Sequence, residues 1–212
     1  MTMRYDWMDE YLLSKRAVTK DLQAEWNWIR YKIGDRMFAA ILLDDGDDRP
    51  VYINLKLDPA EGEFLRGQYE DIIPGYYSDK RCWNSVNPDG EVPDELLRGL
   101  LDKSYALVLK GFPKKKQREI LGLSACGADC AACPLHGNAC QGCNEACGRV
   151  FHAPKDKPCP IYACCVGKHR FATCGDCADA PCDLWRATRD PSYSDEAFEA
   201  SIVQRMGNLK GV

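Results

Sequence analysis

The first half of the chain carries apolar segments whose spacing predicts the strands of a sheet. From Trp26 to Ile33, two sets of residues alternate in steps of two and are rich in aromatic and β-branched side chains, which is typical of a strand. The continuous apolar run from Met37 to Leu43 suits a central strand. Two shorter runs predict strands at Val51–Leu55 and Cys82–Val86. The polar stretch 18–23 is predicted to be a connection.

Apolar residues at helical spacing predict helices around these strands. Tyr5 to Leu13 places several large side chains on one side of a short helix. Asp58 can cap a second helix, and Pro59 suits its first position. From Pro93 to Leu109, leucines recur three and four residues apart and form one apolar stripe. The order helix, three strands, helix, strand, helix predicts an α+β domain with an antiparallel sheet.

Cysteine usage divides the chain into two unequal parts. One of the thirteen cysteines precedes residue 125, and the other twelve lie between Cys126 and Cys182. This division predicts an α+β domain over residues 1–120 and a small, irregular, metal-stapled cysteine-rich domain over 121–212. A final helix, predicted from Ser192 to Met206, carries an apolar stripe that is expected to dock on a domain or on a partner chain.

The cysteine-rich segment holds few large apolar side chains, so apolar burial alone is not expected to fold it. The first twenty residues lack the apolar run of an ordinary secretory signal. No apolar stretch reaches the roughly 18 residues that predict a membrane span, so no membrane partner is expected. A cytoplasmic chain meets a reducing environment, where structural disulfides are rare. We therefore expect metal–thiolate bonds in this segment.

Three C-x-x-C pairs point to zinc. Two cysteines separated by two residues present both sulfurs to one ion, and repeated pairs are typical of tetrahedral zinc sites. With some additional donors, ten cysteines in tight groups are enough for two or three ions. These ten candidate ligands are Cys126, Cys130, Cys133, Cys140, Cys143, Cys159, Cys164, Cys174, Cys177 and Cys182. Five further side chains rank behind them: Cys147, Cys165, His136, His152 and His169.

An iron–sulfur cluster is the alternative cofactor. Cys126, Cys130 and Cys133 have the C-x3-C-x2-C spacing that radical-SAM enzymes use for a [4Fe–4S] cluster. Those enzymes set the cluster in a barrel of strands and helices, for which this segment has no room. The bacterial ferredoxin run of cysteines is also absent. The spacing therefore favours zinc.

The same cysteines carry a resemblance to a known family. The pattern C-G-x-D-C-x-x-C-P begins at Cys126 and is followed by C-x-G-C at Cys140, C-P-I-Y-A-C at Cys159 and C-G-D-C-A-D-A-P-C at Cys174. It resembles a cysteine-rich bacterial and archaeal domain family of uncharacterised function. The ten grouped cysteines fit the family pattern. The resemblance implies a metal-binding module and brings no known activity.

The first domain resembles the MmcQ/YjbR-like family, over about Tyr5 to Leu109. An ordered set of short stretches carries the resemblance, namely 32–39, 54–56, 74–77, 80–83, 92–97 and 104–105. The family is associated with a DNA-binding-like α+β fold. The resemblance therefore implies an architecture and makes nucleic acid a candidate partner.

The charge pattern offers only local surfaces for nucleic acid. The net charge is −4, without the basic excess of a strong nucleic-acid binder. Two groups of basic residues could neutralise phosphates, and the first group also contains an aromatic ring that could stack on a base. Alternatively, Trp83 is part of the core and the charges are solvated. The candidates are Lys32, Lys56, Lys80, Arg81 and Trp83 in the first domain, and Lys114, Lys115 and Lys116 in the linker.

No nucleophile–base motif, P-loop or dinucleotide fingerprint occurs in the sequence. Zinc sites filled by four thiolates would leave no position for water or substrate, which argues against hydrolysis. The sequence therefore favours a non-enzymatic, zinc-stabilised two-domain binding protein with nucleic acid or another protein as its partner. The alternatives are an iron–sulfur redox or sensor protein, and a protein- or small-molecule-interaction module without a nucleic-acid role.

Overall fold

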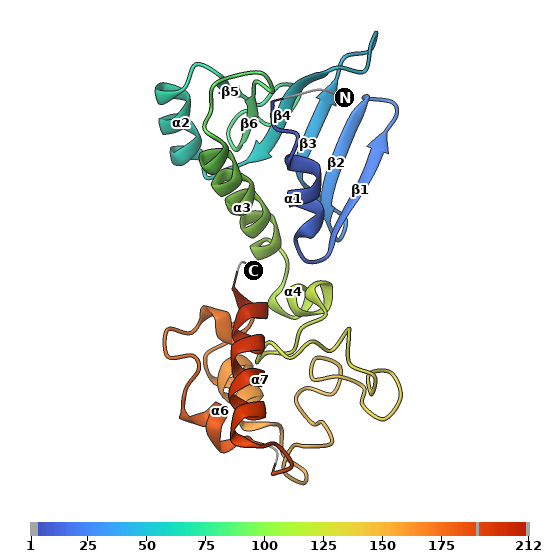
Figure 1. The fold of residues 1–212 in the computed structure, drawn as a ribbon, viewed down its shortest axis with the longest axis vertical. Helices are drawn as coiled ribbons and strands as arrows, with labels where there is room; N and C mark the ends of the chain where they lie inside the picture. The colour runs from blue at the N-terminus through green and yellow to red at the C-terminus, as the bar shows by residue number, and fades with distance from the viewer. Residues whose placement is uncertain (1–3, 190, 211–212) are drawn as a thin grey trace. The chain divides into compact units, whose positions relative to one another are not determined.

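The computed structural model describes residues 4–189 and 191–210, which form two compact units that divide between Gly111 and Phe112. The first unit contains a six-stranded antiparallel sheet with the order β1-β2-β3-β4-β6-β5 (Figure 1). Its strands are β1 (Val18–Gln23), β2 (Trp28–Ile33), β3 (Arg36–Leu43), β4 (Pro50–Lys56), β5 (Ile72–Pro74) and β6 (Trp83–Val86). The predicted α+β class with an antiparallel sheet is confirmed.

Both edge strands were missed by the sequence prediction. The stretch predicted as a polar connection is β1, whose Val18 pairs with Ile33 of β2. The other edge, β5, lies in a segment for which no strand was predicted, and its Pro74 pairs with Asn84 of β6. Polar residues and proline are tolerated at a sheet edge because one side of the strand has no neighbour to pair with. The apolar alternation that identifies inner strands is therefore weak in both.

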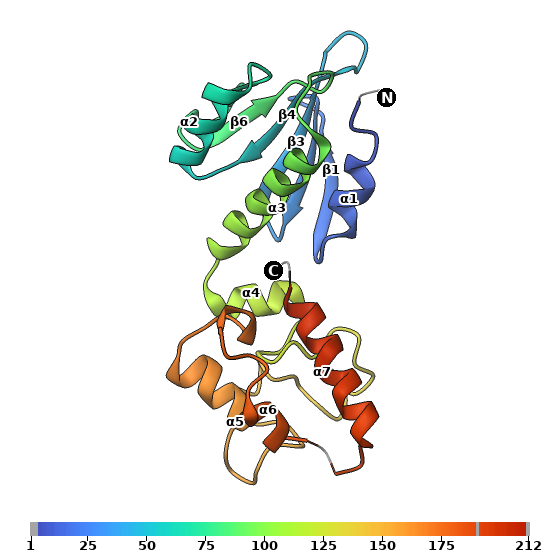
Figure 2. The same cartoon turned by 60° about the vertical axis from the view of Figure 1, so that its left-hand side comes forward.

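Helices α1 (Met8–Ser14) and α3 (Asp94–Lys110) lie over the same face of the sheet (Figure 2). Helix α2 (Pro59–Gln68) contacts β5, and Asp58 caps it by accepting a hydrogen bond from the Ala60 amide, as predicted. The face toward α1 and α3 carries most of the core of this unit. Its buried strand residues are Tyr31, Ala39, Ile41, Ile53, Leu55 and Val86.

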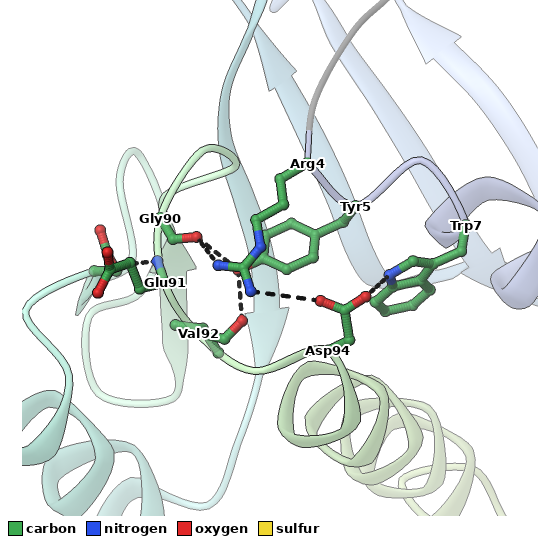
Figure 3. Close-up of polar contacts among 8 residues, drawn as sticks. Arg4, Tyr5, Trp7, Gly90, Glu91, Val92 and Asp94 are labelled. Carbon is green, nitrogen blue, oxygen red and sulfur yellow. Dashed lines mark hydrogen bonds and ion pairs between the residues drawn. The ribbon is translucent and has the colours of Figure 1, made fainter.

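The segment that leads into α1 is fastened to the start of α3 (Figure 3). The hydroxyl of Tyr5 donates to the Val92 carbonyl at 2.8 Å, and the indole N–H of Trp7 donates to the Asp94 carboxylate at 2.7 Å. The Arg4 guanidinium adds an ion pair with Asp94 at 3.7 Å. The two hydrogen bonds join residues 87 positions apart in sequence, and with the ion pair they hold the two covering helices together.

The second unit is built from short helical segments and loops. They are α4 (Lys114–Leu121), α5 (Pro160–Tyr162), a π-helical turn η1 (Ala163–Lys168), a single turn η2 (Cys174–Asp176), α6 (Asp183–Ala187) and α7 (Asp195–Leu209). The basic run predicted as a linker is therefore a helix. It ends at Gly122, which has a φ of 62°, a conformation that glycine adopts without strain.

Helix α7 supplies much of the apolar core of the second unit. Phe198, Ile202 and Leu209 are buried beside Trp185, which is 1% exposed. Val203, which lies inside the predicted helix, is 71% exposed and outside this core, while Leu209 lies beyond the predicted end of the helix at Met206. No helix in the described part of the chain has both the length and the apolar character needed to cross a membrane.

Candidate functional site

The cysteines of the second unit gather around two cavities. All thirteen cysteines of the chain are free thiols. A first cavity of about 780 Å³ is lined by six of them, the first cysteine group: Cys126, Cys130, Cys133, Cys140, Cys143 and Cys159. A second, of about 30 Å³, is lined by five, the second cysteine group: Cys164, Cys165, Cys174, Cys177 and Cys182. Each of the ten predicted ligands therefore lines one of the two cavities.

Tight turns position the first cysteine group. Gly127 and Gly142 have φ values of 75° and 94°, which allow the chain to reverse directly after Cys126 and between Cys140 and Cys143. Within the second of these turns, the Gly142 amide donates to the Cys140 sulfur at 3.4 Å. The C-x-x-C spacing thus forms a turn in which a backbone amide faces a cysteine sulfur.

The thiols of the first group influence one another electrostatically. Burial, together with the neighbouring Cys126, Cys130, Cys159 and Cys140, raises the pKa of Cys143. Burial is also the main cause that raises the pKa of Cys130. Several thiolates in one buried place repel each other, and a bound cation reverses this effect by stabilising the deprotonated form.

The second cysteine group is centred on two buried thiols. Cys165 and Cys174 are 4% and 6% exposed, and a hydrogen bond between them lowers the pKa of Cys165 and raises that of Cys174. Thr173 and Asp176 form a capping box around η2, which begins at Cys174. Trp185, which is 1% exposed, also lines this cavity.

The five lower-ranked candidates fall in different places. Cys165 belongs to the second group, and His169 lines the same cavity, stacked on Phe171 with ring centroids 5.3 Å apart. His152 lines the first cavity, and His136 is exposed beside Gly142. Cys147 is exposed and interacts with Tyr162 rather than with either group.

The candidate ligand side chains lie in the same two regions, but they are not arranged around the position of an ion. Over residues 4–189 and 191–210, no three cysteine, histidine or carboxylate side chains stand close enough together to hold one metal ion. The chemistry of the two groups is that of zinc or iron–sulfur ligands, because both are made of thiols and each contains at least four. A bound ion would require the sulfurs to draw closer.

Sequence reasoning missed one charged side chain at the first group. The Arg205 guanidinium, on α7, donates to the Cys126 sulfur at 3.7 Å and lies 4.5 Å above the Trp185 ring. It therefore places a fixed positive charge beside a candidate ligand. The two residues are 79 positions apart, and no local pattern in the sequence connects them.

Two of the cations predicted to contact nucleic acid have carboxylate partners. The Lys32 ammonium lies 2.5 Å from a carboxylate oxygen of Asp21, and the Arg81 guanidinium lies 2.8 Å from Asp79. These ion pairs reduce the positive charge available to a phosphate.

The remaining predicted residues of the first unit lie at the β4–β6 end of the sheet. Lys56 of β4 pairs with Trp83 of β6, and Trp83 is half-buried. Lys80 is exposed in the segment that leads to Trp83. The five predicted residues therefore do not form one continuous basic surface, because Asp21 and Asp79 lie among them.

The basic run on α4 is exposed. Lys115 and Lys116 lie 3.9 Å and 3.6 Å from Glu119, one turn further along the same helix. The Lys114 ammonium donates to the Arg170 carbonyl. Such surface ion pairs are weak, so these lysines keep the ability to contact a phosphate.

The first unit has known relatives. The model of the YjbR family matches residues 13–107. The Escherichia coli protein YbdF is 36% identical over 90 residues, which cover 42% of this chain and 71% of YbdF. Escherichia coli YjbR is 28% identical over 114 residues, which cover 54% of this chain and 94% of YjbR. Both relatives are described as uncharacterized proteins.

A solved structure agrees with these matches. The crystal structure of a Deinococcus radiodurans protein superposes with a TM-score of 0.50 and 35% sequence identity, covering 57% of this chain and 90% of that protein. The matches to the relatives lie in the part of the chain that carries the six-stranded sheet. Through this sheet and its helices, the chain belongs to the YjbR family.

Proposed function

We propose that this protein is a non-enzymatic, cytoplasmic binding protein whose second unit is stabilised by zinc–thiolate bonds. One observation carries the proposal: the ten predicted ligands divide into two spatial groups, and each group supplies at least the four donors of a tetrahedral ion.

Each cysteine group would hold its own metal. In the second group, Cys164, Cys174, Cys177 and Cys182 are a complete set of four, with Cys165 beside them. The first group has six thiols, more than one tetrahedral ion needs. Zinc bound by thiolates is a structural ion, and it would contribute an apparent ~10–16 kcal/mol per site to folding. This supports at least two ions.

Metal analysis of the purified full-length chain tests the metal. A colourless protein that contains two or three equivalents of zinc would support the proposal. A brown protein with a broad visible absorption band would replace it with a [4Fe–4S] redox or sensor protein. A chain that remains folded after a strong chelator and a reductant have removed all metal would overturn both.

The partner of the protein is the second part of the proposal. The YjbR-like unit would recognise nucleic acid or another protein, and the exposed lysines of α4 are the basic group best placed to contact phosphates. A band-shift experiment with the full chain tests this reading. Binding that weakens steeply with salt and disappears in the triple variant Lys114→Ala, Lys115→Ala, Lys116→Ala would support nucleic acid. Its absence would leave the protein- or small-molecule-interaction role.

A further inference from the structure

The face of the sheet opposite α1 and α3 carries a cavity that the cysteine chemistry does not use. Trp28, Ala40 and Leu42 form a small buried cluster on this face, with Tyr52 packed against it. A cavity of about 690 Å³ opens beside this cluster. Its volume lies within the range typical of small-molecule sites.

Aromatic rings form the walls of the cavity. The rings of Trp26 and Trp28 meet edge to face with centroids 5.6 Å apart. Three tyrosines form a second group of rings, in which the ring centroid of Tyr76 lies 5.0 Å from that of Tyr52 and 4.4 Å from that of Tyr77. Trp26 is 55% exposed and Tyr77 81% exposed. Large aromatic side chains that are exposed to solvent around a concave surface are typical of a binding site.

Buried polar groups fix the loop that carries the tyrosines. The Asn54 side chain donates to the Tyr76 carbonyl at 3.1 Å, and the Tyr76 amide donates to the Ser85 hydroxyl at 2.7 Å. Asn54 and Ser85 are fully buried. Tyr77 has a φ of 52°, an uncommon conformation for a residue other than glycine. The backbone at Tyr76 is thus held in place before any ligand arrives, which lowers the entropy cost of binding.

The charge of the cavity is negative. Its lining includes the carboxylates of Glu25, Asp44, Asp45 and Asp79, and no lysine or arginine belongs to the lining in the described part of the chain. Asp79 is paired with Arg81, whereas Glu25 and Asp45 have no partner among residues 4–189 and 191–210. A phosphate is repelled by such a lining, while a cation is attracted by both the carboxylates and the faces of the rings.

We propose that this cavity binds an alkylated ammonium group, carried either by a small molecule or by a methylated lysine side chain. The faces of Trp26 and Tyr77 would contact the alkyl groups, and Glu25 and Asp45 would neutralise the charge. Nothing in this assignment depends on the metal in the second unit or on nucleic acid, so it can fail or succeed independently of them.

The test is a titration of the full chain with choline, followed by the indole N–H signals in NMR spectra. The signals of Trp26, Trp28 and Trp83 are expected to move, because these rings line the cavity. The signals of Trp7 and Trp185 are expected to stay. A neutral analogue of choline, with carbon in place of the ammonium nitrogen, is expected to bind about fivefold more weakly or worse.

Variants with matched controls connect the binding to the cavity. Trp26→Ala and Tyr77→Ala are each expected to weaken binding about fivefold or more, and the pair Glu25→Gln, Asp45→Asn by a similar factor. Phe64→Ala, an aromatic residue of α2 that is 66% exposed and lies outside the cavity, is the control for the rings. Glu63→Gln, also exposed on α2, is the control for the charges.

Comparing the binding of a peptide with that of choline distinguishes the two sources of the ammonium group. A peptide with trimethyl-lysine that binds more tightly than choline, while its unmodified counterpart does not, would assign the site to a protein ligand. Choline binding at least as tight as that of the peptide would assign it to a small molecule. Equal binding of choline and its neutral analogue, unchanged binding in the cavity variants, or no binding of choline and the peptide would overturn the proposal.

Discussion

The guanidinium of Arg205 donates a hydrogen bond to the sulfur of Cys126 across 3.7 Å, and so joins α7 to the first cysteine group. Cysteine binds metal as a thiolate, and the Arg205 guanidinium lies where it can donate a hydrogen bond to such a sulfur. The same side chain lies over Trp185, in the core of the second unit. Arg205 is therefore in a position to support a bound ion without being a ligand.

Replacing Arg205 by glutamine is expected to weaken zinc binding about tenfold, as is typical when a side chain that supports a metal ligand is lost. Competition with a zinc chelator measures this change. The control is Arg186→Gln, which removes an arginine of α6 that is ion-paired with Glu199 and lies outside the first group. Equal zinc affinity in the Arg205→Gln variant and the wild type would contradict a supporting role.

Each cysteine group is expected to lose its own metal when one ligand is replaced. Cys143→Ser in the first group and Cys174→Ser in the second should each lower the zinc content, by up to about one equivalent, because each removes one of the sulfurs available to the ion of its group. Metal analysis of the purified variants is the measurement. Cys82→Ser, in the first unit, is the control and should keep the full metal content. Full zinc content in both group variants would contradict the assignment.

The Ser104 hydroxyl bridges α3 and the sheet. It donates to the Phe38 carbonyl at 2.5 Å and accepts from the Lys56 amide at 2.8 Å, and Ser104 is fully buried. Ser104→Ala leaves both backbone groups without this partner, so we expect the free energy of unfolding to fall by about 1–3 kcal/mol. Urea denaturation followed at the Trp7 indole measures it. Ser14→Ala, at an exposed serine of α1, should have little effect.

Acid is expected to weaken the edge of the sheet at Asp21. Hydrogen bonds from Arg30 and Lys32 lower the pKa of Asp21 to about 2, from an ordinary value of 3.8. Because the folded-state pKa is the lower one, the charged carboxylate stabilises the folded state above pH 3.8, and this contribution is lost as the pH falls toward about 2. Its size is small, since the group is exposed to solvent.

The Asp21→Asn variant tests this pH dependence. Its urea midpoint should lie below that of the wild type at neutral pH and converge with it as the pH falls from 3.8 to about 2. Asp35→Asn, in the turn between β2 and β3, is the matched control and should not show the convergence. A constant difference across the pH range would show that Asp21 contributes through packing rather than charge.

Periodicity predicted those elements of the first unit that bury a strong apolar face. The inner strands β2, β3, β4 and β6 and helices α1 and α3 were found in this way, and α2 was found from its cap, whereas β1 and β5 were not found. An edge strand is stabilised by pairing with its neighbouring strand, which its own local sequence does not reveal. In β1, for example, Val18 pairs with Ile33 of β2, beyond the intervening turn. The aromatic cavity was missed for the same reason, because Trp26 and Tyr77, which are far apart in the sequence, line one cavity only after the sheet has formed.

The type of donor in the second unit was evident from the sequence, but the spatial grouping was not. Cys159 lines the first cavity and Cys164 the second, although only the helical segment α5 and the start of η1 separate them. A helical turn directs side chains to different sides, so nearness in sequence did not indicate a shared site. The expectation that apolar burial alone does not fold the segment from Cys126 to Cys182 considered that segment by itself, whereas Trp185 and Phe198, which lie beyond Cys182, are buried in one core with its cysteines.

A glycine determines how closely α7 approaches the first cysteine group. Gly127 has a φ of 75°, and a Cβ atom on it would collide with the Arg205 carbonyl oxygen and lie 2.8 Å from the Leu209 Cγ atom. The Asn208 side chain also donates to the Gly127 carbonyl at 2.9 Å. An alanine here must therefore push α7 away and adopt a left-handed conformation, which alone costs ~1–2 kcal/mol.

The Gly127→Ala variant is accordingly expected to unfold its second unit at lower urea and to lose zinc faster than the wild type. The Trp185 indole signal in NMR spectra reports the unfolding of this unit, because Trp185 lies in its core. Gly207→Ala, on α7 with open space around it, is the matched control and should stabilise the helix by ~0.5–1 kcal/mol. If both variants were stabilised alike, α7 would not need this close approach, and the contact between Arg205 and Cys126 would not depend on it.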